Sequence, residues 1–130
     1  EPRVLKEIKN AQGETILKTR PKVRRELRVK PEHLLVIREG MRLTATPIGT
    51  APVMATLPIS IGAKTGTAEL GADRQRVNSW FIGFAPLDNP KIAIATALEG
   101  GHVSNLVGAT TATKMMLEWL IIYRPNMVGM

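Results

Sequence analysis

Residues 61–69 read Ile61-Gly62-Ala63-Lys64-Thr65-Gly66-Thr67-Ala68-Glu69, and this stretch decides the fold class. The pattern predicts a β-strand that ends in the signature Lys-Thr-Gly-Thr. Because side chains alternate along a strand, Thr65 and Thr67 are predicted on one face and Lys64 on the other. Gly66 leaves the space between the threonines open, and a glycine inside a strand often marks close approach by a ligand or another backbone. The strand edge therefore suits an anionic, peptide-like ligand that lies along it.

The Lys-Thr-Gly triplet alone recurs by chance, and its alternative interpretation is a strand end with a solvated Lys64 before a polar loop. The neighbouring sequence adds three further motifs in order, which are Gly49-Thr50-Ala51, Ser79-Trp80-Phe81-Ile82-Gly83-Phe84-Ala85-Pro86 and Pro90-Lys91-Ile92-Ala93-Ile94-Ala95. With them, the chain resembles the C-terminal part of a penicillin-binding protein transpeptidase domain. That family belongs to the superfamily of serine β-lactamases and D,D-peptidases, which shares the motifs Ser-x-x-Lys, Ser-x-Asn and Lys-Thr-Gly. The resemblance covers residues 31–122 well and residues 1–30 loosely, and it looks most like a class B enzyme of the elongation type.

The composition sets outer limits on the class of protein. A chain of 130 residues with 44% hydrophobic residues forms one globular domain or part of one. No apolar run reaches the length of about 18 residues that a membrane span needs. The absence of cysteine removes disulfides, thiol catalysis and thiolate metal sites. The start, Glu1-Pro2-Arg3, has no Met or signal peptide and reads as an internal cut. The net charge of +7 favours anionic partners.

The first thirty residues are predicted to form a hairpin and a basic connector. Residues 4–18 read as two short strands around a turn, where Gly13 supplies positive φ. A basic run follows over residues 18–30, made of Lys18, Arg20, Lys22, Arg24, Arg25, Arg28 and Lys30. This run is either a solvated connector, which we favour, or a contact with anionic lipid or nucleic acid. No aromatic side chain is interleaved for base stacking, so we expect no nucleic-acid partner.

A helix is predicted over residues 31–45, with Pro31 at its first position. Its apolar residues recur with helical period at Leu34, Leu35, Ile37, Met41 and Leu43. Several prolines make the next stretch irregular. Within it, Gly49-Thr50-Ala51 is either a segment that packs under the site or a simple loop.

Three strands are predicted next, over residues 59–67, 79–86 and 91–99, with a polar loop over residues 71–78. The last two strands are apolar on successive residues, which indicates that both faces of the sheet are covered. Trp80 and Phe84 are therefore predicted to be core residues rather than a substrate platform.

A long C-terminal helix is predicted after Gly100-Gly101 ends the third strand. Ser104 or Asn105 is the expected cap, and the helix runs to about Ile122. Its buried stripe is predicted to comprise Leu106, Thr110, Thr113, Leu117 and Leu120, widened by Met115, Met116 and Trp119. This helix can cover one face of the sheet, and only one other helix is available for the second face. We therefore expect an α/β fold of the α+β kind, an antiparallel sheet with helices on both faces, incomplete in residues 31–130.

The nucleophile that the resemblance implies is missing from the chain. The three serines are Ser60, Ser79 and Ser104, and none of them begins Ser-x-x-Lys or Ser-x-Asn. We therefore expect both motifs in an upstream segment outside this chain, which could be a separate chain left by proteolysis. The two histidines, His33 and His102, complete no catalytic triad and no metal pattern, so neither a metal nor a cofactor is expected.

The resemblance implies specific roles for four residues. Lys64 would form a hydrogen bond with the serine of the missing Ser-x-Asn and keep the site electropositive. The hydroxyls of Thr65 and Thr67 would hold the carboxylate of a D-alanyl-D-alanine stem peptide or of a β-lactam. The backbone N–H of Thr67 would form half of an oxyanion hole, and Gly66 would let the ligand approach the strand.

The function implied is a peptidoglycan D,D-transpeptidase that cross-links stem peptides through an acyl-serine intermediate. Such an enzyme would act on the outer face of the bacterial cytoplasmic membrane, anchored by a segment outside this chain. One alternative is a non-catalytic β-lactam sensor domain with the same fold. The other is a basic module that binds nucleic acid or lipid, which predicts salt-sensitive binding without β-lactam reactivity.

Overall fold

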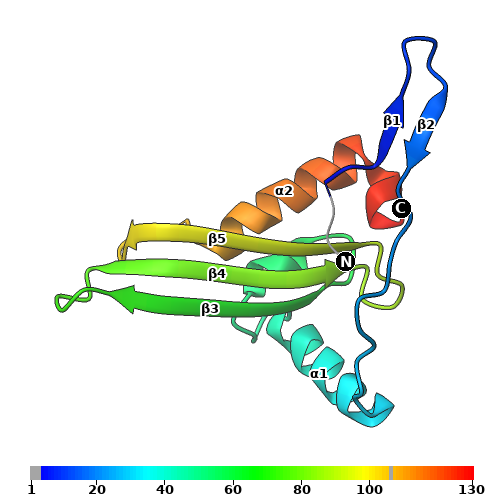
Figure 1. Ribbon diagram of the computed structural model, residues 1–130. Helices are drawn as coiled ribbons and strands as arrows, with labels where there is room; N and C mark the ends of the chain where they lie inside the picture. Colours follow the sequence, from blue (N-terminus) through cyan, green and yellow to red (C-terminus); the bar gives the residue numbers. More distant parts are fainter. Residues whose placement is uncertain (1–3, 106) are drawn as a thin grey trace. The chain divides into compact units, whose positions relative to one another are not determined.

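The computed structural model describes residues 4–105 and 107–130 (Figure 1). The chain divides into two compact units, Glu1–Lys30 and Pro31–Met130. Among the described residues, no helix reaches the length and hydropathy that a membrane span requires.

The first unit contains a two-stranded antiparallel hairpin. Strand β1 (Glu7–Lys9) pairs with β2 (Thr15–Lys18), and Ile8 stands opposite Leu17. The Asn10 side chain closes the turn, because its Oδ1 accepts hydrogen bonds from the backbone N–H groups of Gln12 and Glu14 at 3.1 and 2.8 Å. Gly13 adopts a φ of +84°. The predicted hairpin over residues 4–18 is confirmed, with shorter strands.

Charge is distributed unevenly along the sequence. Residues 1–30 contain ten Lys and Arg against four Asp and Glu, so they carry +6 of the net charge of +7. Residues 20–30 are exposed and have no regular secondary structure. The remaining hundred residues have a net charge of only +1.

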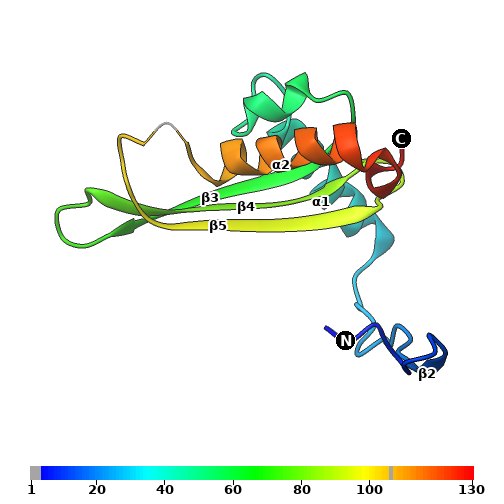
Figure 2. The same cartoon turned by 90° about the horizontal axis from the view of Figure 1, so that it is seen from above.

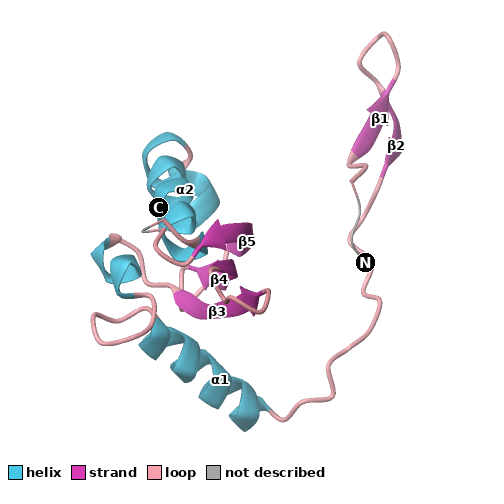
Figure 3. Cartoon of the chain, turned by 90° about the vertical axis from the view of Figure 1, so that its left-hand side faces the viewer, coloured by secondary structure: helices cyan, strands magenta, loops and turns pink. Residues whose placement is uncertain are grey.

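The second unit is built around a three-stranded antiparallel sheet in the order β3-β4-β5. Its elements, in chain order, are α1 (Pro31–Thr44), the 3-10 helix η1 (Pro52–Thr56), β3 (Gly62–Leu70), β4 (Arg76–Ala85), β5 (Ile92–His102), α2 (Ala109–Tyr123) and the 3-10 helix η2 (Pro125–Val128). Figure 2 shows the sheet nearly edge-on, with α2 along one side of it. Figure 3 looks along the strands and shows α1 next to β3, with which it is in contact. The predicted fold class, an antiparallel sheet combined with helices, is confirmed.

The strand boundaries differ from the prediction. β3 begins and ends three residues later than predicted, so the Lys-Thr-Gly-Thr signature lies inside the strand rather than at its end. β4 begins at Arg76, which pairs with Leu70, so the predicted loop over residues 71–78 is too long. Backbone pairing extends the hairpin here through polar residues that a hydropathy pattern assigns to a loop.

Gly100-Gly101 does not end the third strand, because β5 continues to His102. The pairing between β4 and β5 shifts by one residue between Val77 and Ser79. Gly100 takes a φ of +64° at this β-bulge, and its N–H donates to Oδ1 of Asn78 at 2.9 Å. The glycines therefore accommodate a bulge within the strand.

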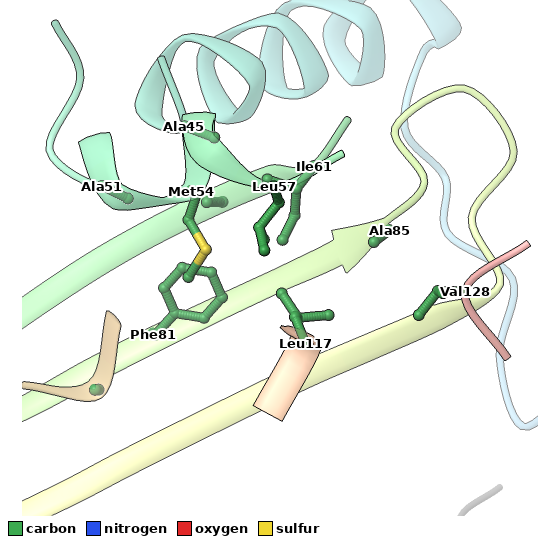
Figure 4. Close-up of a cluster of buried hydrophobic side chains, with 11 residues drawn as sticks. Ala45, Ala51, Met54, Leu57, Ile61, Phe81, Ala85, Leu117 and Val128 are labelled. Carbon is green, nitrogen blue, oxygen red and sulfur yellow. The ribbon is translucent and has the colours of Figure 1, made fainter. Parts of the chain in front are cut away.

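The core lies between one face of the sheet, α2 and η1 (Figure 4). Phe81 of β4 is fully buried there and is the largest side chain of the cluster. Met54 of η1, Leu117 of α2 and Val128 of η2 complete the buried centre. This packing fixes which face of the sheet points inward, because residues of the same parity as Phe81 share its face.

The opposite face of β4 is partly exposed among the described residues, as expected for a sheet whose second layer is incomplete in residues 31–130. Trp80 is 45% exposed and Ile82 is 51% exposed, which corrects the prediction that Trp80 is a core residue. Phe84, on the same face, is half-buried and lies against Gly62, where an added Cβ would come within 2.5 Å of its ring.

Both helices expose apolar residues that were predicted to be buried. α1 has the predicted extent, but none of its residues is buried and only Met41 of its predicted stripe is half-buried. In α2, Thr113 and Leu117 are buried as predicted, whereas Met115, Met116 and Trp119 are exposed. Helical period identifies the apolar side of a helix, but burial also requires a neighbouring layer. Leu106 lies outside the described residues.

Candidate functional site

The site predicted from sequence lies on an edge of the sheet. β3 pairs with β4 and, among the described residues, with no other strand. Thr65 stands opposite the buried Phe81, whereas Lys64 stands opposite the exposed Ile82. Thr65 and Thr67 therefore share one face and Lys64 lies on the other, as the alternation predicts.

Lys64 is exposed and is the third residue of β3. Its Nζ donates a hydrogen bond to the backbone carbonyl oxygen of Thr65. A carbonyl leaves the ammonium charge uncompensated, whereas a carboxylate would neutralise it. Lys64 can therefore attract an anionic ligand toward this strand.

The hydroxyl of Thr65 is bonded to a residue far away in the sequence. Oγ1 of Thr65 lies 2.8 Å from Oγ1 of Thr50. Thr50 belongs to the Gly49-Thr50-Ala51 motif that follows α1, and Ala51 is fully buried. Of the two interpretations of this motif, packing against the site strand is confirmed.

Neither the neighbouring atoms nor the backbone conformation requires residue 66 to be a glycine. A Cβ at this position would lie 3.4 Å from Cβ of Trp80, which is an ordinary van der Waals distance, and its φ is not in the left-handed region. By contrast, a Cβ at Gly62 would overlap the ring of Phe84. Gly66 pairs with Trp80 and so lies on the face of Lys64, where its surroundings leave room for a methyl group.

Thr67 is exposed and borders a cleft of about 370 Å³ between the sheet and the segment that leads into α2. The cleft is also lined by Leu98, His102, Asn105 and Val107. The described residues around it combine apolar side chains with two hydroxyls, an imidazole and an amide, and none of them is a carboxylate.

The start of α2 forms one wall of this region and is held by the sheet. α2 begins at Ala109, so the predicted caps Ser104 and Asn105 are wrong. The N–H of Ala109 donates to Oγ of Ser79 at 2.9 Å, and Ser79 is the cross-strand partner of Thr67. This cap comes from thirty residues earlier in the sequence, and local patterns cannot reveal it.

The remaining serines and histidines have structural hydrogen bonds or are solvated. Oγ of Ser60 accepts the N–H of Leu87 at 3.2 Å, and Oγ of Ser104 lies 2.7 Å from Nδ1 of His102. His33 is exposed on α1. Across the part of the chain that the structure describes, no group of three or more His, Asp and Glu could hold a metal ion.

Sequence reasoning did not assign a hydrogen-bonding role to Thr50 or Ser79. Gly49 could have drawn attention to Thr50, because a glycine often marks a tight turn and a tight turn fixes the position of the neighbouring side chain. A Cβ at Gly49 would lie 2.3 Å from the carbonyl oxygens of Leu43 and Thr44. Ser79 gave no such signal.

Comparison with known proteins gives a consistent result. Residues 1–117 match the family described as the penicillin binding protein transpeptidase domain. Peptidoglycan D,D-transpeptidase PbpA of Mycolicibacterium smegmatis is 32% identical over 102 residues, which is 77% of this chain and 20% of that protein. The chain thus spans about a fifth of the length of this relative.

Solved structures agree with the sequence match. Penicillin-binding protein 2B of Streptococcus pneumoniae R6 superposes with a TM-score of 0.73 at 25% identity, covering 90% of this chain and 20% of that one. An imipenem acyl-enzyme complex of penicillin-binding protein A from M. tuberculosis gives 0.64 at 26% identity, covering 86% of this chain and 24% of that one. The resemblance drawn from the ordered motifs is therefore confirmed, and this chain belongs to the penicillin-binding protein transpeptidase domain family.

Proposed function

We propose that this chain is the C-terminal part of a peptidoglycan D,D-transpeptidase and that residues 31–130 supply part of its active site. The observation that carries the proposal is the edge strand β3, which presents Lys64, Thr65, Gly66 and Thr67 without a second strand partner among the described residues. Curated relatives of the chain are named peptidoglycan D,D-transpeptidases.

The side chains of this strand suit the carboxylate of a peptide that ends in D-alanyl-D-alanine. Thr65 and Thr67 point to one face, so both hydroxyls can donate to the same carboxylate. Hydrogen bonds to an ionised acceptor are roughly twice as strong as those between neutral groups. Lys64 adds a positive charge nearby and would bond to a serine of a Ser-x-Asn motif outside this chain.

The backbone of the same strand suits the reacting carbonyl. A serine hydroxyl outside this chain would attack the carbonyl carbon of the penultimate D-alanine, and the N–H of Thr67 would donate to the developing oxyanion. The C–N bond then breaks, and the terminal D-alanine leaves as the free amine with the proton of the serine. An amine of a second stem peptide attacks the acyl-serine ester, which restores the serine and completes the cross-link. Loss of one oxyanion donor costs about 3–4 kcal/mol of barrier.

A β-lactam would react at the same place, because it combines a strained carbonyl with a carboxylate. The homologous structure from M. tuberculosis is described as an imipenem acyl-enzyme complex. We propose that the transpeptidase containing this chain is acylated by β-lactams in the same way. It would act on the outer face of the bacterial cytoplasmic membrane, held by an anchor that lies outside this sequence.

Labelling with a fluorescent penicillin tests the proposal. The 130-residue chain alone and the full-length protein that contains it are each labelled and separated on a denaturing gel. We expect the full-length protein to label at a serine outside residues 1–130 and the chain alone to remain unlabelled. A label on the chain itself would show that the nucleophile was wrongly placed, and an unlabelled full-length protein would contradict the proposal.

A variant at the site and a matched control variant show whether labelling depends on Lys64. Lys64→Ala is expected to lower labelling by about a hundredfold or more, because it removes the charge beside the site. Lys91→Ala is the matched control, since Lys91 is an exposed lysine just before β5 and away from β3. Turnover of a D-alanyl-D-alanine peptide then separates the two functions of this fold, because a sensor domain would label without producing cross-linked product.

A further inference from the structure

We infer that Thr50 is a positioning residue for Thr65: its hydroxyl orients the Thr65 hydroxyl so that Thr65 donates its proton to the carboxylate of the ligand. The inference rests on the proposed function, because it assigns Thr65 to carboxylate binding. Thr50 itself need not touch the ligand.

The backbone holds Thr50 in one place. The N–H of Ala51 donates to the carbonyl oxygen of Thr44 at 2.9 Å, and the N–H of Gly49 donates to that of Thr46 at 2.9 Å. Gly49 approaches the end of α1 so closely that any side chain there would overlap the backbone. Ala51, on the other side of Thr50, is fully buried. The Thr50 hydroxyl is therefore presented to β3 from a rigid turn.

The contact with Thr65 has two possible directions. With Oγ1 atoms 2.8 Å apart, either hydroxyl can be the donor. If Thr65 donates to Thr50, Thr65 offers only lone pairs to an approaching carboxylate, and these lone pairs repel the carboxylate. If Thr50 donates to Thr65, the Thr65 proton is free to point at the ligand. A bound carboxylate selects the second arrangement, and Thr50 is already in position to supply it.

The value of this arrangement is preorganisation. Without a partner, the Thr65 hydroxyl can rotate among its staggered positions, and only some of them direct the proton toward the carboxylate. With Thr50 as donor, one lone pair of Thr65 is occupied and the orientation is restricted. The effect should therefore appear only with ligands that carry a negative charge at this place.

Acylation of the full-length protein by penicillin G and by its methyl ester tests the inference. Thr50→Val keeps the shape of the side chain and removes the hydroxyl. With penicillin G, we expect Thr50→Val to be acylated about three- to tenfold more slowly than the wild-type protein, as for the loss of one neutral hydrogen bond. With the methyl ester, we expect the variant and the wild-type protein to be acylated at the same rate. Thr50→Ser retains the hydroxyl and should keep the wild-type rate.

A matched control comes from the same turn. Oγ1 of Thr46 donates to the carbonyl oxygen of Leu43 at 2.7 Å, so Thr46→Val also removes a hydroxyl hydrogen bond, but one whose acceptor belongs to α1 and not to β3. Thermal unfolding of both variants should show similar losses of stability, whereas acylation should fall only in Thr50→Val. In a Thr65→Val background, Thr50→Val should have no further effect.

Each other outcome overturns the inference. An unchanged rate for Thr50→Val with penicillin G would show that Thr65 needs no partner, while leaving the proposed function intact. Equal losses with acid and ester, or equal losses in Thr46→Val, would show that Thr50 acts only through stability. A wild-type protein that is not acylated at all would overturn the proposed function and this inference together.

Discussion

Substitution of Gly66 by alanine should separate the stability of this domain from its activity. The new methyl group would lie 3.4 Å from Cβ of Trp80, at ordinary contact distance, and the backbone there is not in the left-handed region. A glycine inside a strand is less stable than alanine by about 0.5–1 kcal/mol, so we expect the free energy of unfolding to stay the same or rise by that amount. The methyl group would nevertheless project on the face of the strand that carries Lys64 and Trp80, next to the lysine of the proposed site. A displacement of about 1 Å at a reacting centre costs about a hundredfold in rate, so acylation by penicillin should fall at least that much.

Two other glycines provide controls for Gly66→Ala. A methyl group added at Gly40 of α1 would meet nothing within 4 Å, so Gly40→Ala should stabilise the protein by about 1 kcal/mol and leave acylation unchanged. Gly62→Ala would place its Cβ 2.5 Å from the Phe84 ring, and it should destabilise the protein by about 1–3 kcal/mol. Stability is read from urea unfolding and acylation from fluorescent penicillin. A Gly66→Ala protein that unfolds more easily yet is acylated at the wild-type rate would refute the reasoning on both counts.

Three further outcomes follow from the packing and the ion pairs. Ser79→Ala leaves the N–H of Ala109 without its acceptor and should lower the free energy of urea unfolding by about 1 kcal/mol, whereas an unchanged midpoint would show that Ser79 does not cap α2. Phe81→Ala empties the centre of the core and should cost about 3–5 kcal/mol by the same measurement; a loss below about 1 kcal/mol would place the core elsewhere. The side-chain hydrogen bond from Arg42, with its charge, lowers the pKa of Glu39, so the stability from this pair is present above the unfolded-state pKa of Glu39 and disappears as pH falls through its folded-state pKa. The difference in unfolding midpoint between wild type and Glu39→Gln should therefore shrink on acidification, and a difference that persists in acid would have another origin.

Patterns confined to neighbouring residues predicted much of the fold. The alternation around Lys64 and Thr65 predicted a strand with the correct faces, and β3 has them. Helical period and Pro31 predicted the extent of α1 within one residue. Gly13 predicted the turn of the first hairpin. In each case the information lies within a few residues of the element that it specifies.

Features that depend on distant contacts were missed. The glycines at 100 and 101 read as the end of a strand, because only the position of Asn78 on the neighbouring strand makes them a bulge. The start of α2 is capped by Ser79, so nearby polar residues such as Ser104 misled the prediction. The exposure of Trp80 has a similar origin: an apolar strand face is buried only where another layer covers it.

Within the candidate site, the four residues of the strand were named from sequence, whereas their support was not. The resemblance drew attention to Thr65 and Thr67, but the hydroxyl of Thr50 reaches Thr65 only because the turn after α1 folds back onto β3. Motifs specify residues that act on a ligand, and the tertiary fold specifies which other residues orient them.

The concentration of positive charge in residues 1–30 also affects how the protein behaves in crowded solution. Molecules with a large net charge repel one another, whereas a net charge near zero promotes association. Proteolytic removal of these thirty residues would leave a unit of net charge +1 that still exposes Trp80 and Ile82. Within this chain, the hairpin and its connector therefore carry nearly all of the net charge that makes separate molecules repel one another.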